Sequence, residues 1–283
     1  MAIAFPARER PVHSVRTRGV HWMAQRTDEP AESDRDGRPA RGLRIARGTP
    51  IGYSGAMCGR YILAQQAKFE RAVQLGRVHW EFTARYNVAP SQSVPVVRNA
   101  EGMHEGVMMR WGLIPFFAHG VAPKYSTINA TIEKLVSGPA WRGPWKRAQR
   151  CVQLAAGFYE WHLEATGRKQ PYFIHLTDEP VFGFASLWDR SIGADGVTIE
   201  SCAIITLPAN DLLRAIHNTG AHPGRMPAIL APGQFAAWLD GTPDEARSVL
   251  AAYPTQRMSA HPVSLRVNSP RNEGPELIAP LQQ

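Results

Sequence analysis

The sequence predicts an α+β fold whose sheet is largely antiparallel and barrel-like, with helices on its flanks. Segments with strand character outnumber helical segments, and they do not alternate in the strand–helix–strand rhythm that parallel sheets require. Hydrophobic residues make up 44% of the 283 residues and eight are Trp, which suffices for a sizeable packed core. The length suits one domain of roughly 200–250 residues plus a tail, or two small domains.

Residues 1–56 differ in composition from the rest of the chain. They contain ten Arg, six acidic residues and no Lys, with almost no apolar periodicity. Such a segment cannot bury enough apolar surface to offset the entropy of ordering, so we expect a disordered leader. It lacks the apolar core of a secretory signal, and its acidic residues argue against a transit peptide. The globular domain is therefore expected to occupy residues 57–283.

Apolar patterns and turn residues predict the elements of this domain in order. A short strand at 58–63 precedes a helix at 64–76, which Gly76 would end. A strand at 106–115 would be closed by Pro115. Further strands are expected at 150–157, 171–176, 181–188 and 197–207, with a hairpin turn at 164–170. Helices are expected at 210–217, 232–239 and 243–253, with Pro or Asp near their starts.

Charge and cysteine usage restrict the class of protein. The formal net charge of +8 favours an anionic partner, nucleic acid first, with a basic enzyme lacking such a partner as the alternative. The three cysteines, Cys58, Cys151 and Cys202, are far apart, and no paired Cys or His spacing predicts a metal site, so we expect no metal or other cofactor. A reducing, cytoplasmic setting is favoured. No apolar run approaches the ~18–20 residues that would cross a bilayer.

Cys58 directly follows Met57 at the start of the globular region. If Met57 is the first residue, its removal leaves Cys58 with a free α-amine beside its thiol. Their reference pKa values, about 7.7–8.0 and about 8.5, leave both groups partly deprotonated near neutral pH. Such a residue suits attack on an aldehyde, because the amine can form a Schiff base and the thiol can close a thiazolidine ring. The alternative is a small buried hydrophobic residue.

Two further candidates suit acid–base chemistry. Glu160 lies between Tyr159 and Trp161, where an apolar setting should raise its pKa; the alternative is a strand residue that points to water. His217 ends a helical pattern beside a loop, which suits a general acid–base group or a helix C-cap. His222 is a rival to His217 in the same loop.

Five other residues could contact a substrate. Arg225 is well placed for a phosphate or an internal carboxylate. The Asn129 side chain could orient a substrate, although Asn in a loop is more often a turn residue. In "RYNVAPSQ" and "RWGLIPFF", Arg85, Arg110 and Trp111 offer the arginine and aromatic pairing that binds single-stranded nucleic acid, unless the Trp belongs to the core.

Taken together, these motifs resemble the SOS-response-associated peptidase (SRAP) family of abasic-site processing proteins. The match runs collinearly from Met57 to about Leu281, through MCGRY, RYNVAPSQ, RWGLIP, INATIE, GFYEW, PYFIH, IHN and RMPAIL. The resemblance implies a single SRAP-like domain, acting as a monomer at the nucleoid in the cytoplasm. Its implied activity is to bind abasic sites in single-stranded DNA and form a protective thiazolidine crosslink.

The resemblance also implies roles for individual residues. Cys58 is similar to the crosslinking nucleophile of the family, which also frees itself by autoproteolysis. Asn129 is similar to the residue that holds the opened deoxyribose. Glu160 corresponds to the acid–base group and His217 to its partner. Arg60 and Arg225 resemble phosphate-binding positions.

The chain departs from the family pattern at two places. Many members read N-A-R-x-E where this chain has Thr131 in place of the arginine, which puts part of the DNA affinity in doubt. Many members also run I-H-D-R-M-P without a break, whereas here six residues separate Asn218 from Arg225. The longer loop keeps His222 open as an alternative, although the "IHN" context favours His217.

Two explanations fit the Met57–Cys58 pair. Either Met57 is the true start, or the leader is cut before Cys58; the first is favoured. With residues 1–56 attached, Cys58 has no free amine and no thiazolidine is expected. Two other functions remain open: a thiol peptidase that uses Cys58, His217 and Glu160, and a non-catalytic module that binds single-stranded DNA.

Overall fold

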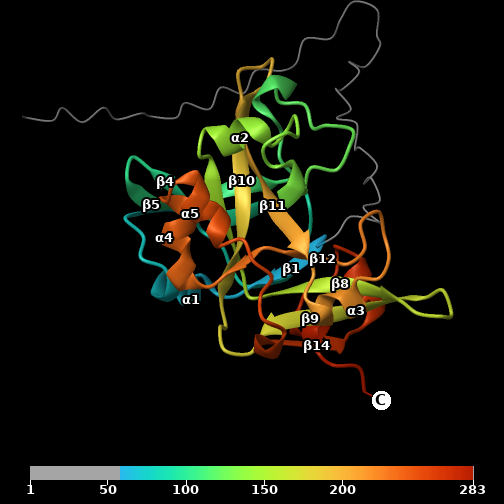
Figure 1. Cartoon of the computed structure of the whole chain (residues 1–283). Helices are drawn as coiled ribbons and strands as arrows, with labels where there is room; N and C mark the ends of the chain where they lie inside the picture. The colour runs from blue at the N-terminus through green and yellow to red at the C-terminus, as the bar shows by residue number, and fades with distance from the viewer. Residues whose placement is uncertain (1–57, 283) are drawn as a thin grey trace, which may run out of the picture. The chain divides into compact units, whose positions relative to one another are not determined.

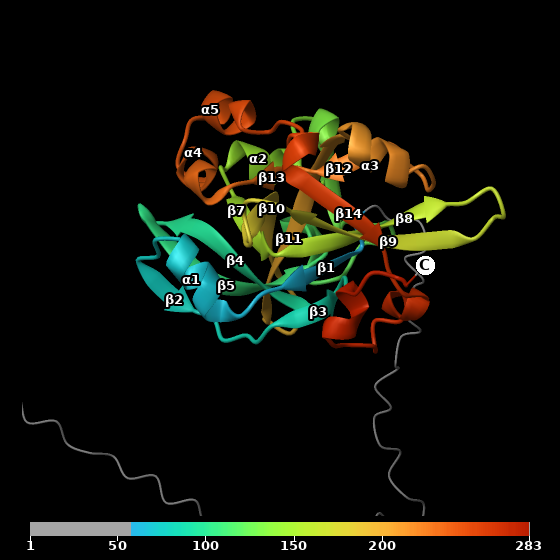
Figure 2. The ribbon, with the colours of Figure 1, turned by 90° about the horizontal axis from the view of Figure 1, so that it is seen from below.

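The computed structural model describes residues 58–282, in which the strands form two sheets (Figure 1). The smaller sheet has the order β14-β9-β8-β1-β3, and all its neighbouring strands are antiparallel. Its strands are β1 (Arg60–Leu63), β3 (Arg85–Val88), β8 (Gly157–Leu163), β9 (Lys169–Leu176) and β14 (Met258–Pro262). The predicted hairpin turn at 164–170 joins β8 to β9, and this hairpin projects from the body of the domain in both views (Figures 1 and 2).

The larger sheet closes into a barrel. Its path runs β12-β11-β10-β7-β4-β5-β2, and β11 also pairs with β5, so five strands form a ring. The closing pair is parallel and joins Ser201 to Arg110 and Cys202 to Trp111. The strands of the ring are β4 (Ser93–Ala100), β5 (Met103–Trp111), β7 (Arg150–Ala155), β10 (Phe182–Ile192) and β11 (Thr198–Pro208). The predicted α+β fold with a largely antiparallel, barrel-like sheet is confirmed.

Short strands extend the barrel at its edges. β6 runs parallel to β11, β12 pairs with the end of β11, and β13 pairs with β10. β2 pairs with β5. Their bounds are β2 (Arg77–His79), β6 (Asn129–Thr131), β12 (Arg225–Pro227) and β13 (Ile229–Leu230).

The helices are short and lie outside the barrel. They are α1 (Gln66–Ala72), α2 (Arg142–Lys146), α3 (Asp211–Ile216), α4 (Phe235–Leu239) and α5 (Pro243–Ser248). Helix α4 packs on β7, whereas α3 lies beside β8. The expected helix at 64–76 is shorter than predicted, because Val73 already has extended backbone angles. Gly76 instead donates its backbone N–H to the His104 carbonyl, next to the β2–β5 pair, so it does not cap the helix.

Strand β1 connects the two hydrophobic clusters of the domain. Tyr61 and Leu63 point into the main core, while Ile62 points to the other face and packs with Tyr159 and Phe173. The partner strand β8 begins with Gly157, where an added Cβ would lie 2.5 Å from ring atoms of Phe173. The alternating side chains of β1 therefore pack into both clusters and hold this strand in place. Cys58 lies just before the start of β1.

The predicted leader, residues 1–56, lies outside the described part of the chain. Within that part, no helix combines the length and apolarity that crossing a membrane requires.

Candidate active site

Cys58 lies at the entrance to β1 and is almost completely buried. Only 2% of its surface is exposed, and its backbone nitrogen donates a hydrogen bond to Oε1 of Glu160 at 2.6 Å. Its φ angle of 45° lies in the left-handed region, which costs a non-glycine residue about 1–2 kcal/mol. Strained backbone of this kind is concentrated at functional sites, where the surrounding structure holds it.

Glu160 is held on β8 by its pairing with β1. The register places Tyr159 opposite Arg60, so the next residue along β8 comes beside the segment that precedes β1. Glu160 is 2% exposed, which excludes the alternative of a strand residue that points to water. Burial raises the pKa of the Glu160 carboxyl group, and the charge of His217 and hydrogen bonds from Cys58 offset part of this rise. Glu160 therefore has the raised pKa that the sequence predicted.

The Cys58 thiol is kept protonated by the same surroundings. Burial raises its pKa well above the ordinary range, and the negative charge of Glu160 raises it further. The thiol also hydrogen-bonds Glu160. A reactive thiolate needs the opposite environment, one that lowers the pKa. The thiol is therefore not a preformed thiolate, and it lies beside the Glu160 carboxyl group.

His217 follows the last residue of α3 and is 5% exposed. Its backbone N–H donates to the Leu213 carbonyl at 2.8 Å, and its own carbonyl accepts from Gly224 at 2.8 Å. The backbone N–H of Arg225 donates to its Nδ1 at 3.4 Å. His217 is close enough to Glu160 to influence its pKa, whereas His222 is exposed in the loop.

Asn129 and Arg225 lie on two strands that both pair with β11. Asn129 begins β6 opposite Ile204, and Arg225 begins β12 opposite Pro208. The guanidinium of Arg225 forms a bidentate ion pair with Glu133, at 2.8 and 2.9 Å, and donates to the Thr206 carbonyl at 2.8 Å. Of the two partners expected for Arg225, the structure supplies the internal carboxylate.

The other predicted DNA contacts differ in accessibility. Arg60, Arg85 and Arg110 are half-buried. Arg60 donates to the Asn268 carbonyl at 3.2 Å, Arg85 to Gln92 at 2.8 Å, and Arg110 to the Ser91 hydroxyl at 2.8 Å. Each guanidinium group is therefore held in one orientation by a hydrogen bond, and each arginine keeps some exposed surface that a phosphate could reach.

Trp111 belongs to the core, which was the alternative to a DNA contact. It is fully buried, donates from Nε1 to the Ile128 carbonyl at 3.1 Å, and meets Tyr61 edge-on at 5.3 Å. Neither face of its ring is open to a base.

An exposed aromatic pair was not among the residues that the sequence predicted for the site. Phe116 and Phe117 are 55% and 45% exposed, and their rings meet edge-to-face at 5.5 Å. The guanidinium of Arg147 lies 5.3 Å from the Phe116 ring centre and is held by Asp189 at 3.0 Å. Two consecutive aromatic residues after Pro115, in "RWGLIPFF", were the available signal. Exposed rings with a cation are the surface on which single-stranded bases stack.

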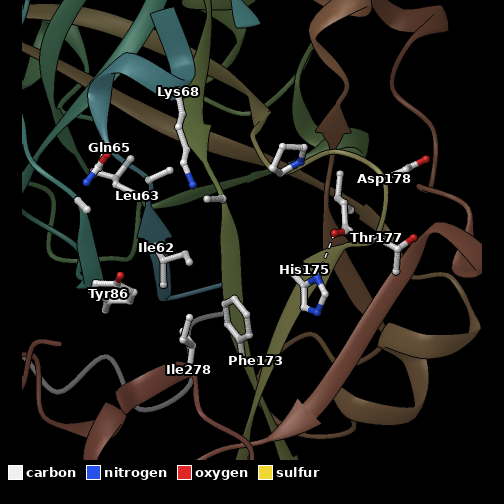
Figure 3. A pocket seen from close by; sticks show the side chains of 15 residues that line it. Ile62, Leu63, Gln65, Lys68, Tyr86, Phe173, His175, Thr177, Asp178 and Ile278 are labelled. Atoms are coloured by element: carbon white, nitrogen blue, oxygen red, sulfur yellow. Dashed lines mark hydrogen bonds between the residues drawn. The ribbon is translucent and has the colours of Figure 1, made fainter. Parts of the chain in front are cut away.

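A separate cavity of about 640 Å³ lies at the other end of β1 (Figure 3). Lys68 points into it, above Phe173 and His175. Its lining does not include Cys58, Glu160 or His217. Within residues 58–282, no three His, Cys, Asp or Glu side chains are arranged to hold a metal ion.

Comparison with known proteins places this site in context. A profile of the family described as SOS response associated peptidase (SRAP) matches residues 57–270. The abasic site processing protein YoqW of Bacillus subtilis is 35% identical over 230 residues, covering 78% of this chain and 99% of YoqW. The abasic site processing protein HMCES of Gallus gallus is 32% identical over 231 residues, covering 70% of this chain and 66% of that protein.

Solved structures show the same fold. A protein from Bacteroides thetaiotaomicron matches with a TM-score of 0.66 and 26% identity, covering 81% of this chain and 99% of its own. A protein from Bordetella bronchiseptica matches with a TM-score of 0.64 and 29% identity, covering 74% of this chain and all of its own.

Proposed function

Because the chain belongs to the SOS response associated peptidase family, we propose that it processes abasic sites in single-stranded DNA by forming a covalent crosslink through Cys58. The observation that carries the proposal is the 2.6 Å contact between the Cys58 nitrogen and the buried carboxyl group of Glu160. Glu160 also faces the thiol, so one acid–base group serves both atoms that would bond to an aldehyde carbon. The similarity to proteins named as abasic site processing proteins supports the same substrate.

The first step of the proposed reaction joins nitrogen to carbon. A ring-opened abasic site carries an aldehyde at C1′, and the amine of Cys58 as first residue adds to this carbon. The resulting carbinolamine loses water and leaves a Schiff base. Glu160 takes a proton from the amine and returns one to the departing hydroxyl group, which suits a carboxyl group whose pKa is raised by burial. His217 would move a proton to the ring oxygen as the sugar opens.

The second step joins sulfur to the same carbon. The thiol adds to the imine carbon, and its proton passes through Glu160 to the imine nitrogen. This closes the five-membered thiazolidine ring, and the net reaction releases one water without oxidation or reduction. Because burial raises the pKa of the Cys58 thiol, we expect the amine to react first. A buried thiol with a raised pKa therefore favours an amine-led reaction over a thiolate-led peptidase.

Further side chains would hold the DNA strand. Asn129 would hold the opened deoxyribose through its amide, as the family resemblance implies. Half-buried Arg60, Arg85 and Arg110 would contact phosphates, and flanking bases would stack on Phe116 and Phe117.

The reaction requires Cys58 as the first residue, which we propose arises at the Met57–Cys58 junction. A chain started at Met57 would need only the removal of that methionine. In a longer chain, the thiol could attack the Met57 carbonyl carbon. The acyl group would move from nitrogen to sulfur, the amine would become free, and water would then hydrolyse the thioester. This autoproteolysis would use the cysteine that later captures DNA.

The test compares chains that begin at Met1 and at Met57, each incubated with single-stranded DNA that bears one abasic site. Denaturing gels, intact mass and the N-terminal residue are read in parallel. We expect a heat-stable adduct from the chain whose first residue is Cys58, and none from Cys58→Ala. The adduct should weigh about 18 Da less than the sum of the protein and the DNA, because the two steps release one water.

Three outcomes would contradict the proposal. An adduct from a Met1 chain whose leader remains intact would exclude the free-amine mechanism. Cleavage of unrelated peptides by that chain, without any DNA adduct, would favour a thiol peptidase that uses Cys58, His217 and Glu160. Salt-sensitive binding that Cys58→Ala leaves unchanged, with no adduct from either form, would indicate a non-catalytic binding module.

A further inference from the structure

The two proposed acid–base groups come from different elements. Glu160 lies on β8, whereas His217 follows the end of α3. Their spacing therefore depends on how the end of α3 is fastened to β8. Proton transfer between groups is sensitive to such spacing, because a displacement of about 1 Å can lower a rate on the order of 100-fold.

Asn218 fastens these elements directly. Its Oδ1 accepts a hydrogen bond from the Leu163 backbone N–H at 2.7 Å, and its Nδ2 donates to the Leu163 carbonyl at 3.0 Å. Leu163 ends β8, three residues after Glu160, and Asn218 directly follows His217. The side-chain amide thus pairs with β8 in both directions, as the backbone of a neighbouring strand would.

A third hydrogen bond supports the same junction. Nδ1 of His162 donates to the carbonyl of Ala215, the last residue but one of α3, at 3.0 Å. On the other side, seven residues separate His217 from Arg225. At the end of this loop the backbone N–H groups of Gly224 and Arg225 donate hydrogen bonds to His217. A long loop restrains its ends weakly, so the contacts to β8 supply a restraint on the end of α3 that the loop does not.

We propose that Asn218 is a positioning residue that sets His217 against Glu160 by joining the end of α3 to β8. The inference rests on the proposed function, since it concerns the same reaction. Asparagine suits this position because its amide both accepts and donates. An aspartate, which the pattern of many family members has here, could accept from Leu163 but could not donate to its carbonyl when ionised.

The test measures the crosslinking rate at saturating DNA for Asn218→Ala and Asn218→Asp, in whichever form of the chain crosslinks. Affinity is measured separately on DNA with a tetrahydrofuran analogue, which has no aldehyde and cannot react. We expect Asn218→Ala to lower the rate about tenfold or more while affinity changes less than about twofold. Asn218→Asp keeps one of the two bonds and should lie between Asn218→Ala and the wild type. The Asn218 side chain is exposed, so neither variant should lose the fold.

The control is Thr166→Ala, which changes the same hairpin at its tip. The hydrogen bonds of Thr166 go to Glu164 and Arg168 within the hairpin, so the rate of this variant should match the wild type. An unchanged rate in Asn218→Ala, with a wild type that crosslinks, would overturn this inference alone. Parallel losses of rate, affinity and melting temperature would also overturn it, because they would indicate a structural role. A wild type that never crosslinks would overturn the proposed function and this inference together.

Discussion

Two opposing influences set the pKa of the Glu160 carboxyl group, and this pKa determines whether the group can act as an acid or a base. Burial favours the neutral acid, whereas His217 and the hydrogen bonds from Cys58 favour the carboxylate. Burial is the larger influence, so the pKa of the Glu160 side chain is raised. A raised pKa makes the carboxyl group a better proton donor when neutral and a better proton acceptor when ionised, and the proposed reaction requires both roles.

This balance predicts how Glu160→Gln changes stability with pH. Because the folded-state pKa of Glu160 is above its unfolded value, the neutral acid favours folding at low pH. That contribution is lost as pH rises through the folded pKa. Gln resembles the neutral acid, so the variant should match the wild type near pH 4 and become progressively more stable relative to it towards pH 8. Thermal unfolding across this range measures the effect, and a difference that does not vary with pH would contradict it.

Thr131 stands where the family pattern has an arginine, so restoring the arginine tests whether this position contacts DNA. Its hydroxyl group hydrogen-bonds Glu133, the partner of Arg225. Thr131→Arg should tighten binding to single-stranded DNA and steepen the dependence of log K on log salt by about 0.7, the effect of one further phosphate contact. Thr131→Gln, which adds length without charge, is the control. Equal salt slopes for the two variants would show that position 131 does not face the strand.

Local sequence was sufficient to predict a site residue where a polar or reactive group stands in an apolar segment. Glu160 carries a charged group inside an apolar segment, and charged residues are seldom buried without a partner. Cys58 was nominated by its place directly after Met57. Trp111 shows the limit, because an aromatic residue beside an arginine has the same local pattern in a core as on a binding surface. Its burial depends on Tyr61 and Ile128, which are distant in sequence.

At the scale of elements, the 3-10 helix η1 (Phe116–Ala118) carries the exposed pair Phe116 and Phe117, which was not predicted from the sequence. If bases stack on it, Phe117→Ala should weaken binding to single-stranded DNA by about 1–3 kcal/mol, the contribution of one stacked base. The crosslinking rate at saturating DNA should change little, because Phe117 lies outside the Cys58–Glu160 contact. Val78→Ala, on the edge strand β2, removes a similarly exposed apolar side chain and is the control. Equal affinities of the two variants would exclude stacking at η1.

Elements were predictable where they are long and apolar. The strands expected at 150–157, 181–188 and 197–207 correspond to β7, β10 and β11. The strands β2, β6 and β12 each have three residues and are defined by their pairing, so they leave no periodic signal of their own. The early end of α1 likewise follows from tertiary context, since Gly76 is drawn to the edge of β5.

At the scale of the whole molecule, the barrel closes through a contact that no local pattern encodes. β5 and β11 pair in parallel although Arg110 and Ser201 are far apart in sequence. The candidate site has the same origin, because β1, β8 and the end of α3 bring together residues 58, 160 and 217. Sequence alone could nominate these three residues, but their proximity depends on the register of β1 with β8 and on the packing of α3.

The same architecture predicts that a chain starting at Met57 folds by itself. Both hydrophobic clusters of the described residues lie within 58–282, and the composition of residues 1–56 predicts no added core. Chains from Met1 and Met57 should therefore unfold in urea at the same midpoint and with the same slope m, because m follows the surface exposed on unfolding. A steeper slope for the Met1 chain would show that residues 1–56 bury surface. Equal unfolding together with a DNA adduct from the Met57 chain alone would assign the difference to the free amine of Cys58 and not to the fold.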